Sequence, residues 1–181
     1  MMSRKYLNDK YCVRCGRKTP TPYLRDNINN LHPVDIYTGP KKKWQVVDIG
    51  CGNGRNSEFM KSYGFENVIS LDMVNDYGIQ MILGKDKMPV EDKSTDVVLC
   101  NYLMMFLNKN ERKQVISEIK RIAKPFCKIM LELYPAKDSE VSNKEEMLNL
   151  QKEIFNMLGW TKVRYSQGRF IAVNKGEWCN E

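Results

Sequence analysis

The stretch VVDIGCGNGRN, from Val46 to Asn56, places an acid and three glycines where they could build a ligand-binding loop. Asp48 follows an apolar run, and Gly50, Gly52 and Gly54 then stand at every second position. Glycines let the backbone approach a ligand closely, because no side chain stands in the way. A loop of this kind at the carboxyl end of a parallel strand lies in the usual ligand crevice.

The loop lacks the features of two phosphate-binding motifs. A P-loop needs Gly-Lys-Ser/Thr, whereas Arg55 and Asn56 follow Gly54. The dinucleotide fingerprint needs a third glycine three positions after the second, and counted from Gly52 that position is Arg55. Asp48 would repel a pyrophosphate but suits a ligand that carries an ammonium group. These residues therefore favour a ligand without phosphate.

A second carboxylate, Asp72, closes the run NVISLD and so ends the next predicted strand. An ionised carboxylate accepts two hydrogen bonds and binds ribose hydroxyls well. An amino acid joined to a nucleoside, with no phosphate, fits both Asp48 and Asp72. S-adenosylmethionine is such a ligand.

Alternating strand and helix signals from Trp44 onward predict the fold that positions these acids. Short apolar runs predict buried strands at WQVVDIG, NVISLD, TDVVLCN and CKIMLEL, and GIQMIL is either a strand or part of a loop. Helices are predicted for GRNSEFMKSYG, for Asn108 to Lys124 before Pro125, and for a segment that ends at Gly159. Capping boxes are expected at Asn108 with Glu111 and at Ser142 with Glu145.

This alternation predicts an α/β fold with a doubly wound, mostly parallel sheet that is covered on both faces. The last segment, WTKVRYSQGRFIAVNK, predicts a C-terminal antiparallel hairpin at the edge of the sheet. The 181 residues suit one continuous core.

The formal charge of +7 lies entirely before Trp44. Residues 1–43 contain ten basic and three acidic residues, and the rest of the chain contains nineteen of each. We therefore predict a basic N-terminal arm, residues 1–43, and a neutral domain, residues 44–181. The arm is expected to be irregular with a short helix near its start, and to pack on the domain through apolar and aromatic residues: Tyr6, Tyr11, Tyr23, Leu31 and Ile36.

Neither a membrane span nor a signal peptide is expected. No apolar run approaches the roughly 20 residues that cross a bilayer, and the N-terminus has no apolar core of the signal-peptide type. The six cysteines are scattered along the chain, so we do not expect a disulfide framework. We therefore expect a cytoplasmic location.

Three segments together resemble the class I S-adenosylmethionine-dependent methyltransferases: VVDIGCGNG, Asp72 after NVISL, and KSTDVVLCNYLMMFL. The resemblance covers residues 44–175. It implies a Rossmann-like methyltransferase fold, an enzyme, and S-adenosylmethionine as the methyl donor. It also implies a set of donor-binding residues, namely Asp48, Gly50, Cys51, Gly52, Gly54, Asp72, Met73, Asp86 and Asn101.

The resemblance assigns roles by position. Asp48 would reach the methionine amine, directly or through water, and Asp72 would hold the ribose hydroxyls while Met73 packs on the adenine. Members of the family often bind the adenine amine with an acid after the third strand, for which Asp86 is the candidate and Asp92 the alternative. Thirteen residues separate Asp72 from Asp86, so the usual second helix is short or missing.

Methyl transfer is a displacement at a sulfonium carbon, in which positioning supplies much of the acceleration. The chain has CNYL after its fourth strand, without the prolines of amino-methylating nucleic-acid enzymes or the Pro-Cys of cytosine-C5 enzymes. No base is evident. The candidates for catalysis are the polar groups at strand ends that face the crevice: Asn101, Tyr102, Glu132 and Tyr134.

A metal site is one interpretation of the arm. YCVRCGRK, with Cys12 and Cys15, resembles one zinc knuckle, and His32 is the candidate third ligand with Cys179 or Cys51 as a distant fourth. The alternatives are a turn with two free thiols and a disulfide.

Three functions remain open. The leading hypothesis is a methyltransferase whose acceptor is RNA, DNA or a target associated with nucleic acid, which the basic arm grips through phosphates and stacked tyrosines. The second is a small-molecule methyltransferase with the arm as a lid. The third is a catalytically silent binding or assembly module that keeps the fold. The oligomeric state is not indicated.

Overall fold

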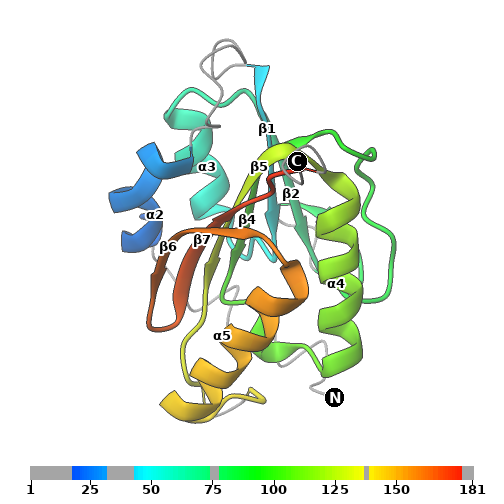
Figure 1. The fold of residues 1–181 in the computed structure, drawn as a ribbon. Coiled ribbons are helices and arrows are strands. Elements are labelled where there is room, and N and C mark those ends of the chain that lie inside the picture. The colour runs from blue at the N-terminus through cyan, green and yellow to red at the C-terminus, as the bar shows by residue number, and fades with distance from the viewer. Residues whose placement is uncertain (1–17, 32–42, 74–77, 137–138, 177–181) are drawn as a thin grey trace.

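The computed structural model describes residues 18–31, 43–73, 78–136 and 139–176, and a seven-stranded sheet forms its centre (Figure 1). The strands are β1 (Gln45–Ile49), β2 (Asn67–Asp72), β3 (Ile79–Gln80), β4 (Thr95–Asn101), β5 (Ala123–Glu132), β6 (Thr161–Ser166) and β7 (Arg169–Val173). Their spatial order is β3-β2-β1-β4-β5-β7-β6. Strands β1 to β5 run parallel, and β7 is antiparallel to both β5 and β6. The predicted fold, including the terminal hairpin, is confirmed.

The strand order reverses at β1, which lies between β2 and β4. Asp48 of β1 stands beside Ser70 of β2 on one side and Leu99 of β4 on the other. The carboxyl ends of β1 and β4 therefore flank the switch point of the sheet, where open α/β sheets hold their ligands.

Helices cover both faces of the sheet (Figure 1). They are α2 (Pro22–Asn27), α3 (Arg55–Ser62), α4 (Lys109–Ile122) and α5 (Lys144–Leu158), with the 3-10 turns η2 (Ile28–Leu31) and η4 (Met104–Phe106). The strand residues Val47, Val98 and Ile129 share a buried cluster with apolar residues of α4 and α5. Their neighbours Val46, Val97 and Met130 point to the opposite face, into a cluster with α2, η2 and α3. Alternation along each strand thus separates the two cores.

Two helix starts test the predicted capping boxes. Asn108 accepts from the backbone amide of Glu111, and Glu111 accepts from the backbone amide of Asn108, as predicted. The second box lies one residue later than the sequence predicts. Asn143 caps α5 by accepting from the amide of Glu146 at 3.0 Å, while the Glu146 carboxylate accepts from the amide of Ser142 at 2.7 Å.

Strand β5 is longer than predicted, because it begins at Ala123 and includes Pro125. Ala123 pairs with Thr95, and the register then shifts by a bulge before Val97 pairs with Lys128. Such a bulge tolerates a proline and a bend within the strand. The uncertain segment GIQMIL forms only the two-residue strand β3.

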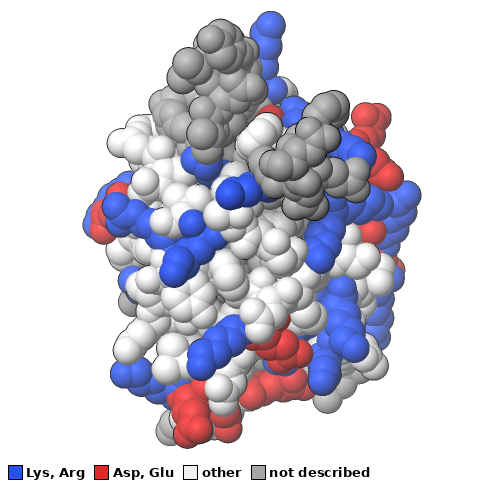
Figure 2. All heavy atoms as spheres, in the orientation of Figure 1, with Lys and Arg blue, Asp and Glu red and all other residues white. Residues whose placement is uncertain are grey.

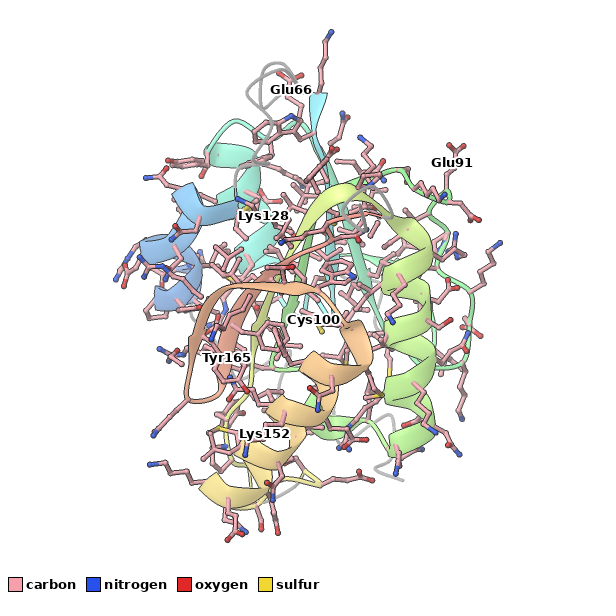
Figure 3. All side chains as sticks on the ribbon, in the orientation of Figure 1. Glu66, Glu91, Cys100, Lys128, Lys152 and Tyr165 are labelled. Atoms are coloured by element: carbon pink, nitrogen blue, oxygen red, sulfur yellow. The ribbon has the colours of Figure 1, made fainter. Side chains whose placement is uncertain are left out.

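Residues 21–31 of the predicted arm pack against the sheet. Tyr23, Leu24 and Leu31 are buried in the cluster that α3 shares, so Tyr23 and Leu31 behave as expected. Lys128 reaches from β5 toward this segment (Figure 3) and donates to the carbonyl of Asn30 at 2.9 Å. The division of the chain at residue 43 stays a prediction.

Tyr6, Tyr11 and Ile36 lie outside the described residues. Of the helices that are described, none combines the length and apolar character needed to cross a membrane.

Candidate functional site

Three glycines with left-handed backbone build the loop between β1 and α3. Gly50, Gly52 and Gly54 have φ angles of +73°, +57° and +73°, which side chains rarely adopt. A Cβ at Gly50 would approach the Cβ of Leu103 to 3.1 Å, so Leu103 packs directly on the loop. A Cβ at Gly52 would meet no atom within 4 Å, so the backbone here borders open space.

The loop is tied to the end of β2 through the backbone and through Asp72. The amides of Gly50 and Cys51 donate to the carbonyl of Leu71 at 2.8 and 3.1 Å. The amide of Gly52 donates to Oδ2 of Asp72 at 2.8 Å, and the amide of Met73 donates to Oδ1 at 2.7 Å. A carboxylate can accept more than two hydrogen bonds, so Asp72 can hold the loop and also accept from a ligand hydroxyl.

Asp48 lies beneath this loop and is 1% exposed. Its Oδ2 accepts from the Ser57 hydroxyl at 2.6 Å, and Ser57 in turn accepts from the Ser70 hydroxyl at 2.8 Å. Burial raises the pKa of Asp48 to about 6; the Ser57 hydrogen bond opposes this shift, and the charge of Asp72 adds to it. A buried carboxylate of this kind gains from a nearby cation.

The end of β4 brings Asn101 and Tyr102 next to the loop, because Leu103 packs on Gly50. Asn101 is 7% exposed, and neither its amide nitrogen nor its amide oxygen has a hydrogen-bond partner in the described structure. Tyr102 has a left-handed φ of +62°, and its amide donates to the carbonyl of Glu132 at 2.8 Å. Asn101 and Glu132 are direct partners in the β4–β5 register.

Glu132, at the end of β5, is fully buried, and its carboxylate accepts hydrogen bonds from more than one side chain. It accepts from the Tyr102 hydroxyl at 2.8 Å and from the Thr21 hydroxyl, and Nε of Arg169 lies 3.5 Å from Oε2. Burial raises the pKa of Tyr102, and the adjacent Glu132 charge adds to this effect. The Tyr102 hydroxyl therefore keeps its proton and is unsuited to act as a base. The ring of Tyr134 meets that of Tyr102 edge-on at 5.2 Å.

Thr21 was not among the predicted site residues. Its hydroxyl reaches Glu132, its own amide donates to Oδ1 of Asn56 at 3.0 Å, and its side chain caps α2 by accepting from Leu24 at 3.2 Å. Thr21 thus joins the start of α3 to the end of β5. The pair Thr21-Pro22 is a helix-start signal, with an N-cap threonine and proline at the first helical position, and it could have located this residue.

The adenine-binding candidates make local contacts. Asp86 accepts from the amide of Ile82 at 2.6 Å, in the turn after β3. Asp92, the alternative, pairs with Arg121 at 2.6 Å. A role for either acid toward a ligand stays a prediction. The amide of Met73 donates to Asp72, and its predicted packing on the adenine stays a prediction.

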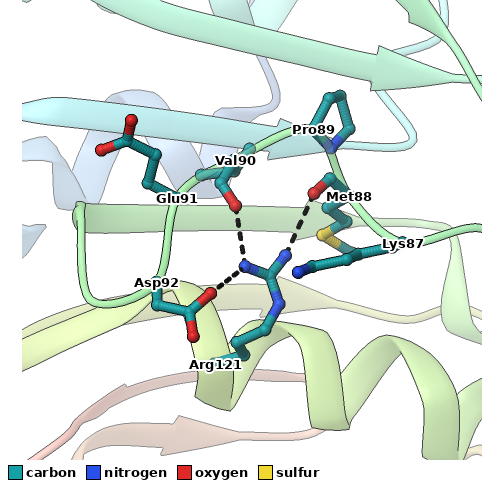
Figure 4. A pocket seen from close by; sticks show the side chains of 7 residues that line it. All are labelled: Lys87, Met88, Pro89, Val90, Glu91, Asp92 and Arg121. Atoms are coloured by element: carbon teal, nitrogen blue, oxygen red, sulfur yellow. Dashed lines mark hydrogen bonds and ion pairs between the residues drawn. The ribbon is translucent and has the colours of Figure 1, made fainter.

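Arg121 also organises a surface groove of about 420 Å³ (Figure 4). Its guanidinium donates to the carbonyls of Val90 and Met88 at 2.8 and 3.0 Å and pairs with Asp92 and Glu118. These contacts occupy the guanidinium, so the groove is explained by the anchoring of the loop before β4 onto α4.

The metal site falls outside the described residues, since Cys12, Cys15, His32 and Cys179 all lie there. Among the residues that are described, no group of three metal-ligating side chains comes together. Cys51 is buried, and its thiol lies 3.9 Å from the carbonyl of Gly52. Zinc binding stays a prediction.

Basic side chains gather along α4 on the face shown in Figure 2, where Lys109, Lys113 and Lys120 are exposed. Acidic side chains lie at the start of α5, where Glu145 and Glu146 occupy the first helical turn. The described surface on this face therefore carries both signs of charge.

Comparison with known proteins completes the description of the site. Residues 47–131 match a family model described as a methyltransferase domain. No curated protein matches the sequence. The fold is similar to that of a SAM dependent methyltransferase from Archaeoglobus fulgidus, with 20% identity, a TM-score of 0.59, and coverage of 76% of this chain and 66% of that one.

Two further solved structures share the fold. A SAM dependent methyltransferase from Aquifex aeolicus is 17% identical, with a TM-score of 0.60 and coverage of 83% of this chain and 88% of that one. The 1,6-didemethyltoxoflavin-N1-methyltransferase of Burkholderia thailandensis was solved with 1,6-didemethyltoxoflavin and S-adenosylhomocysteine. It is 14% identical, with a TM-score of 0.56 and coverage of 72% and 71%.

Proposed function

This chain carries a methyltransferase domain of the class I S-adenosylmethionine-dependent family, and from that premise we propose how its residues hold the donor and what kind of acceptor it methylates. One observation supports the donor site most. The amide of Gly52 donates a hydrogen bond to Asp72, and the backbone at Gly52 borders open space that a ligand could fill. When bound, S-adenosylmethionine supplies an electrophilic methyl group on a sulfonium. The acceptor's lone pair forms the new bond as the carbon–sulfur electron pair stays on sulfur.

The residues of this chain fit that ligand. Asp72 would accept from the ribose hydroxyls, while the loop amides and Asp48 would serve the charged amino-acid end. The buried Asp48 favours a cation over an anion, which matches an ammonium group. Met73 adjoins Asp72 and would pack on the adenine. Asp86, in the turn after β3, would bind the adenine amine.

Catalysis by positioning is the mechanism that these residues support. The Tyr102 hydroxyl donates its proton in a hydrogen bond to Glu132, and its raised pKa keeps it protonated. A proton released by the acceptor would therefore pass to water. Fixing the two reactants in an attack geometry replaces the need for a strong base when the acceptor has a free lone pair. Asn101, Tyr102 and Tyr134 would orient the acceptor.

We favour a small-molecule acceptor. The observation behind this choice is Thr21, which spans from Asn56 to Glu132 and brings α2 over the polar residues at the ends of β4 and β5. A segment held there encloses the acceptor side, as a lid does. The Burkholderia protein named above was solved with a small heterocycle, which supports this choice by analogy of fold.

Nucleic acid is the second candidate, because the chain's whole excess of +7 lies in residues 1–43. A basic arm could grip RNA or DNA through phosphates, in which case binding would weaken steeply with salt. A silent binding module is the third, and it would bind the donor without transferring its methyl group.

Radiolabelled methyl transfer into cell extract separates these functions. The extract is divided into small molecules, nucleic acid and protein before incubation with enzyme and labelled S-adenosylmethionine. We expect label in the small-molecule fraction, and none with Asp72→Ala. Label in the nucleic-acid fraction alone would replace the small-molecule assignment, and donor binding without label in any fraction would favour the silent module.

Two further expectations belong to this proposal. The first is a cytoplasmic location, which the sequence leads us to expect. Metal analysis of the purified full chain would decide whether Cys12, Cys15 and His32 bind zinc, and the expected content is one zinc per chain if they do.

A further inference from the structure

We propose that Arg164, Arg169 and Tyr23 form an anion site beside the acceptor side of the crevice, and that the methyl acceptor is a small carboxylic acid whose carboxylate binds there. This inference rests on the proposed function, because it names a chemical class for the acceptor. It assigns a role to the β6–β7 hairpin and to α2, which lie side by side (Figure 1).

The first support is that two arginines of the hairpin share one face of the sheet. Ile171 of β7 packs in the cluster with α2 and α3, and Arg169 stands two positions before it, so alternation puts Arg169 on that face as well. Arg164 is the register partner of Ile171 on β6, and cross-strand partners project to the same face. Both arginine side chains therefore lie on the face that α2 covers.

Arg169 contacts both the end of β5 and α2. Its Nε lies 3.5 Å from Oε2 of Glu132, and its guanidinium carbon lies 5.5 Å from the centre of the Tyr23 ring. The side chain is nevertheless 45% exposed, so a ligand can reach it. A guanidinium presents five N–H donors in a planar fork, and the contact through Nε leaves donors that can bind a carboxylate.

The second support is a buried donor without a partner. Tyr23 is 9% exposed, and its hydroxyl has no hydrogen-bond partner in the described structure. Burial raises the pKa of Tyr23, so the hydroxyl stays protonated and can donate to an anion. Arg164 is the charge that opposes this rise most, which indicates that its guanidinium lies near the hydroxyl. Buried polar groups are nearly always paired, and an anion held by the arginines would supply the missing acceptor.

The balance of charge at this face favours a monoanion. Two positive charges, Arg164 and Arg169, and one negative charge, Glu132, act on Tyr23. The surplus is therefore one positive charge, which one carboxylate would neutralise. A phosphate monoester carries about −1.5 to −2 charges at pH 7 and would leave an excess beside the buried Glu132, whereas a cationic group would add to the positive surplus.

The position of the site fits the acceptor and not the donor. Arg169 is the register partner of Glu132, which is in turn the partner of Asn101 at the end of β4. Arg169 therefore lies two strands beyond β4, on the side away from the glycine loop after β1. An acceptor with its carboxylate there can extend across β5 toward that loop, past the rings of Tyr102 and Tyr134, which suit an aromatic acid.

The test compares benzoate with benzamide, its neutral counterpart of similar shape. Both are titrated by chemical shift into the full chain saturated with S-adenosylhomocysteine, so that the site for the donor's own carboxylate is filled. We expect wild type to prefer benzoate by at least about tenfold, Arg164→Gln and Arg169→Gln to lose this preference, and Tyr23→Phe to reduce it by about threefold. The control is Lys162→Gln, which removes the same charge from the opposite face of β6 and should bind as wild type does. The affinity for S-adenosylhomocysteine should stay unchanged in every variant.

Arg164→Gln decides the outcome if Arg169→Gln, which loses the contact with Glu132, does not fold. The inference is overturned if wild type binds the two probes equally or binds neither, or if the benzoate preference survives in Arg164→Gln. It is also overturned if Arg164→Gln loses affinity for S-adenosylhomocysteine, which would assign the arginines to the donor. Failure of wild type to bind S-adenosylhomocysteine is instead a failure of the proposed function, so the two failures are distinguishable.

Discussion

Asp72, at the end of β2, and Gly52, in the loop after β1, are joined by a hydrogen bond of 2.8 Å between the carboxylate and the backbone amide. Asp72 therefore stabilises the conformation of the glycine loop, although the residue itself lies in β2. A ligand that uses both would meet a site already assembled, because the same carboxylate also accepts from the amide of Met73. Preorganisation of this kind reduces the entropic cost of binding.

The first prediction concerns Asp72. Replacement by alanine should weaken S-adenosylhomocysteine binding by roughly tenfold to a hundredfold, because both the ligand contact and the bond to Gly52 are lost. Asp72→Asn keeps one acceptor oxygen and should lie between the two. Titration calorimetry measures the affinity of each variant for S-adenosylhomocysteine. Asp26→Asn, an exposed acid on α2, is the control and should bind as wild type does; equal affinity of Asp72→Ala and this control would refute the assignment.

The second prediction follows from the pKa of Asp48 in the protein without ligand. Its folded pKa of about 6 lies above the ordinary value of 3.8, so the folded state holds the proton more tightly than the unfolded state between these pH values. The Asp48 contribution to the unfolding free energy therefore falls as pH rises from about 4 to 6, by about 2–3 kcal/mol. Above pH 6 the contribution stays at its low value.

Urea denaturation of wild type and Asp48→Asn at several pH values checks this, because other titrating groups cancel in the difference between the two proteins. We expect Asp48→Asn to gain stability relative to wild type as pH rises through this window. A difference that does not vary with pH would show that burial does not shift this carboxyl group.

The third prediction concerns Glu132 and Thr21. Glu132→Ala should destabilise the chain by about 3 kcal/mol, because the buried donors of Thr21 and Tyr102 lose their acceptor. Thr21→Val keeps the shape and removes two bonds of the hydroxyl, the one to Glu132 and the cap of Leu24, at about 2 kcal/mol together. Since the two residues share a bond, the double variant should cost less than the sum. Additivity within about 0.5 kcal/mol in denaturant unfolding would contradict the contact.

The fourth prediction concerns residues 1–17, which carry five basic residues and one acid. A chain that begins at Lys18 keeps the segment Thr21–Leu31, whose apolar residues are part of the core. It should fold, bind S-adenosylhomocysteine as the full chain does, and keep transfer to a small acceptor. Loss of transfer together with loss of salt-sensitive RNA binding would favour the nucleic-acid candidate instead.

Sequence reasoning predicted the glycine loop after β1 because its determinants are local. The glycines of residues 50–54 and the apolar runs on either side can be read without knowing the fold, and parallel pairing then brings Asp72 to the same edge. Glu132 could be named as a crevice residue for the same reason. Its bond to Thr21 could not, since 111 positions separate the two residues and only the packing of α2 unites them.

Local chemistry also left one helix start undecided. Ser142 and Asn143 are adjacent, and both are good N-cap residues, so the sequence alone does not choose between them. The structure selects Asn143, whose side chain accepts from Glu146. The unpartnered amide of Asn101 could not be foreseen either, because it depends on what surrounds the end of β4 in three dimensions.

The most direct test of the donor site uses two glycines with the same backbone requirement. Gly52 and Gly159 have φ angles of +57° and +68°, and a Cβ at either would meet no atom within 4 Å. Alanine at each position should therefore cost similar stability, about 1 kcal/mol. Only at Gly52 would the new methyl group enter the space assigned to the ligand.

The decisive measurement is the affinity of wild type, Gly52→Ala and Gly159→Ala for S-adenosylmethionine by calorimetry. We predict one donor bound per wild-type chain, unchanged binding by Gly159→Ala, and at least about a tenfold loss for Gly52→Ala. Wild type that does not bind the donor, or Gly52→Ala that binds it as tightly as Gly159→Ala does, would contradict the placement of the donor over this loop.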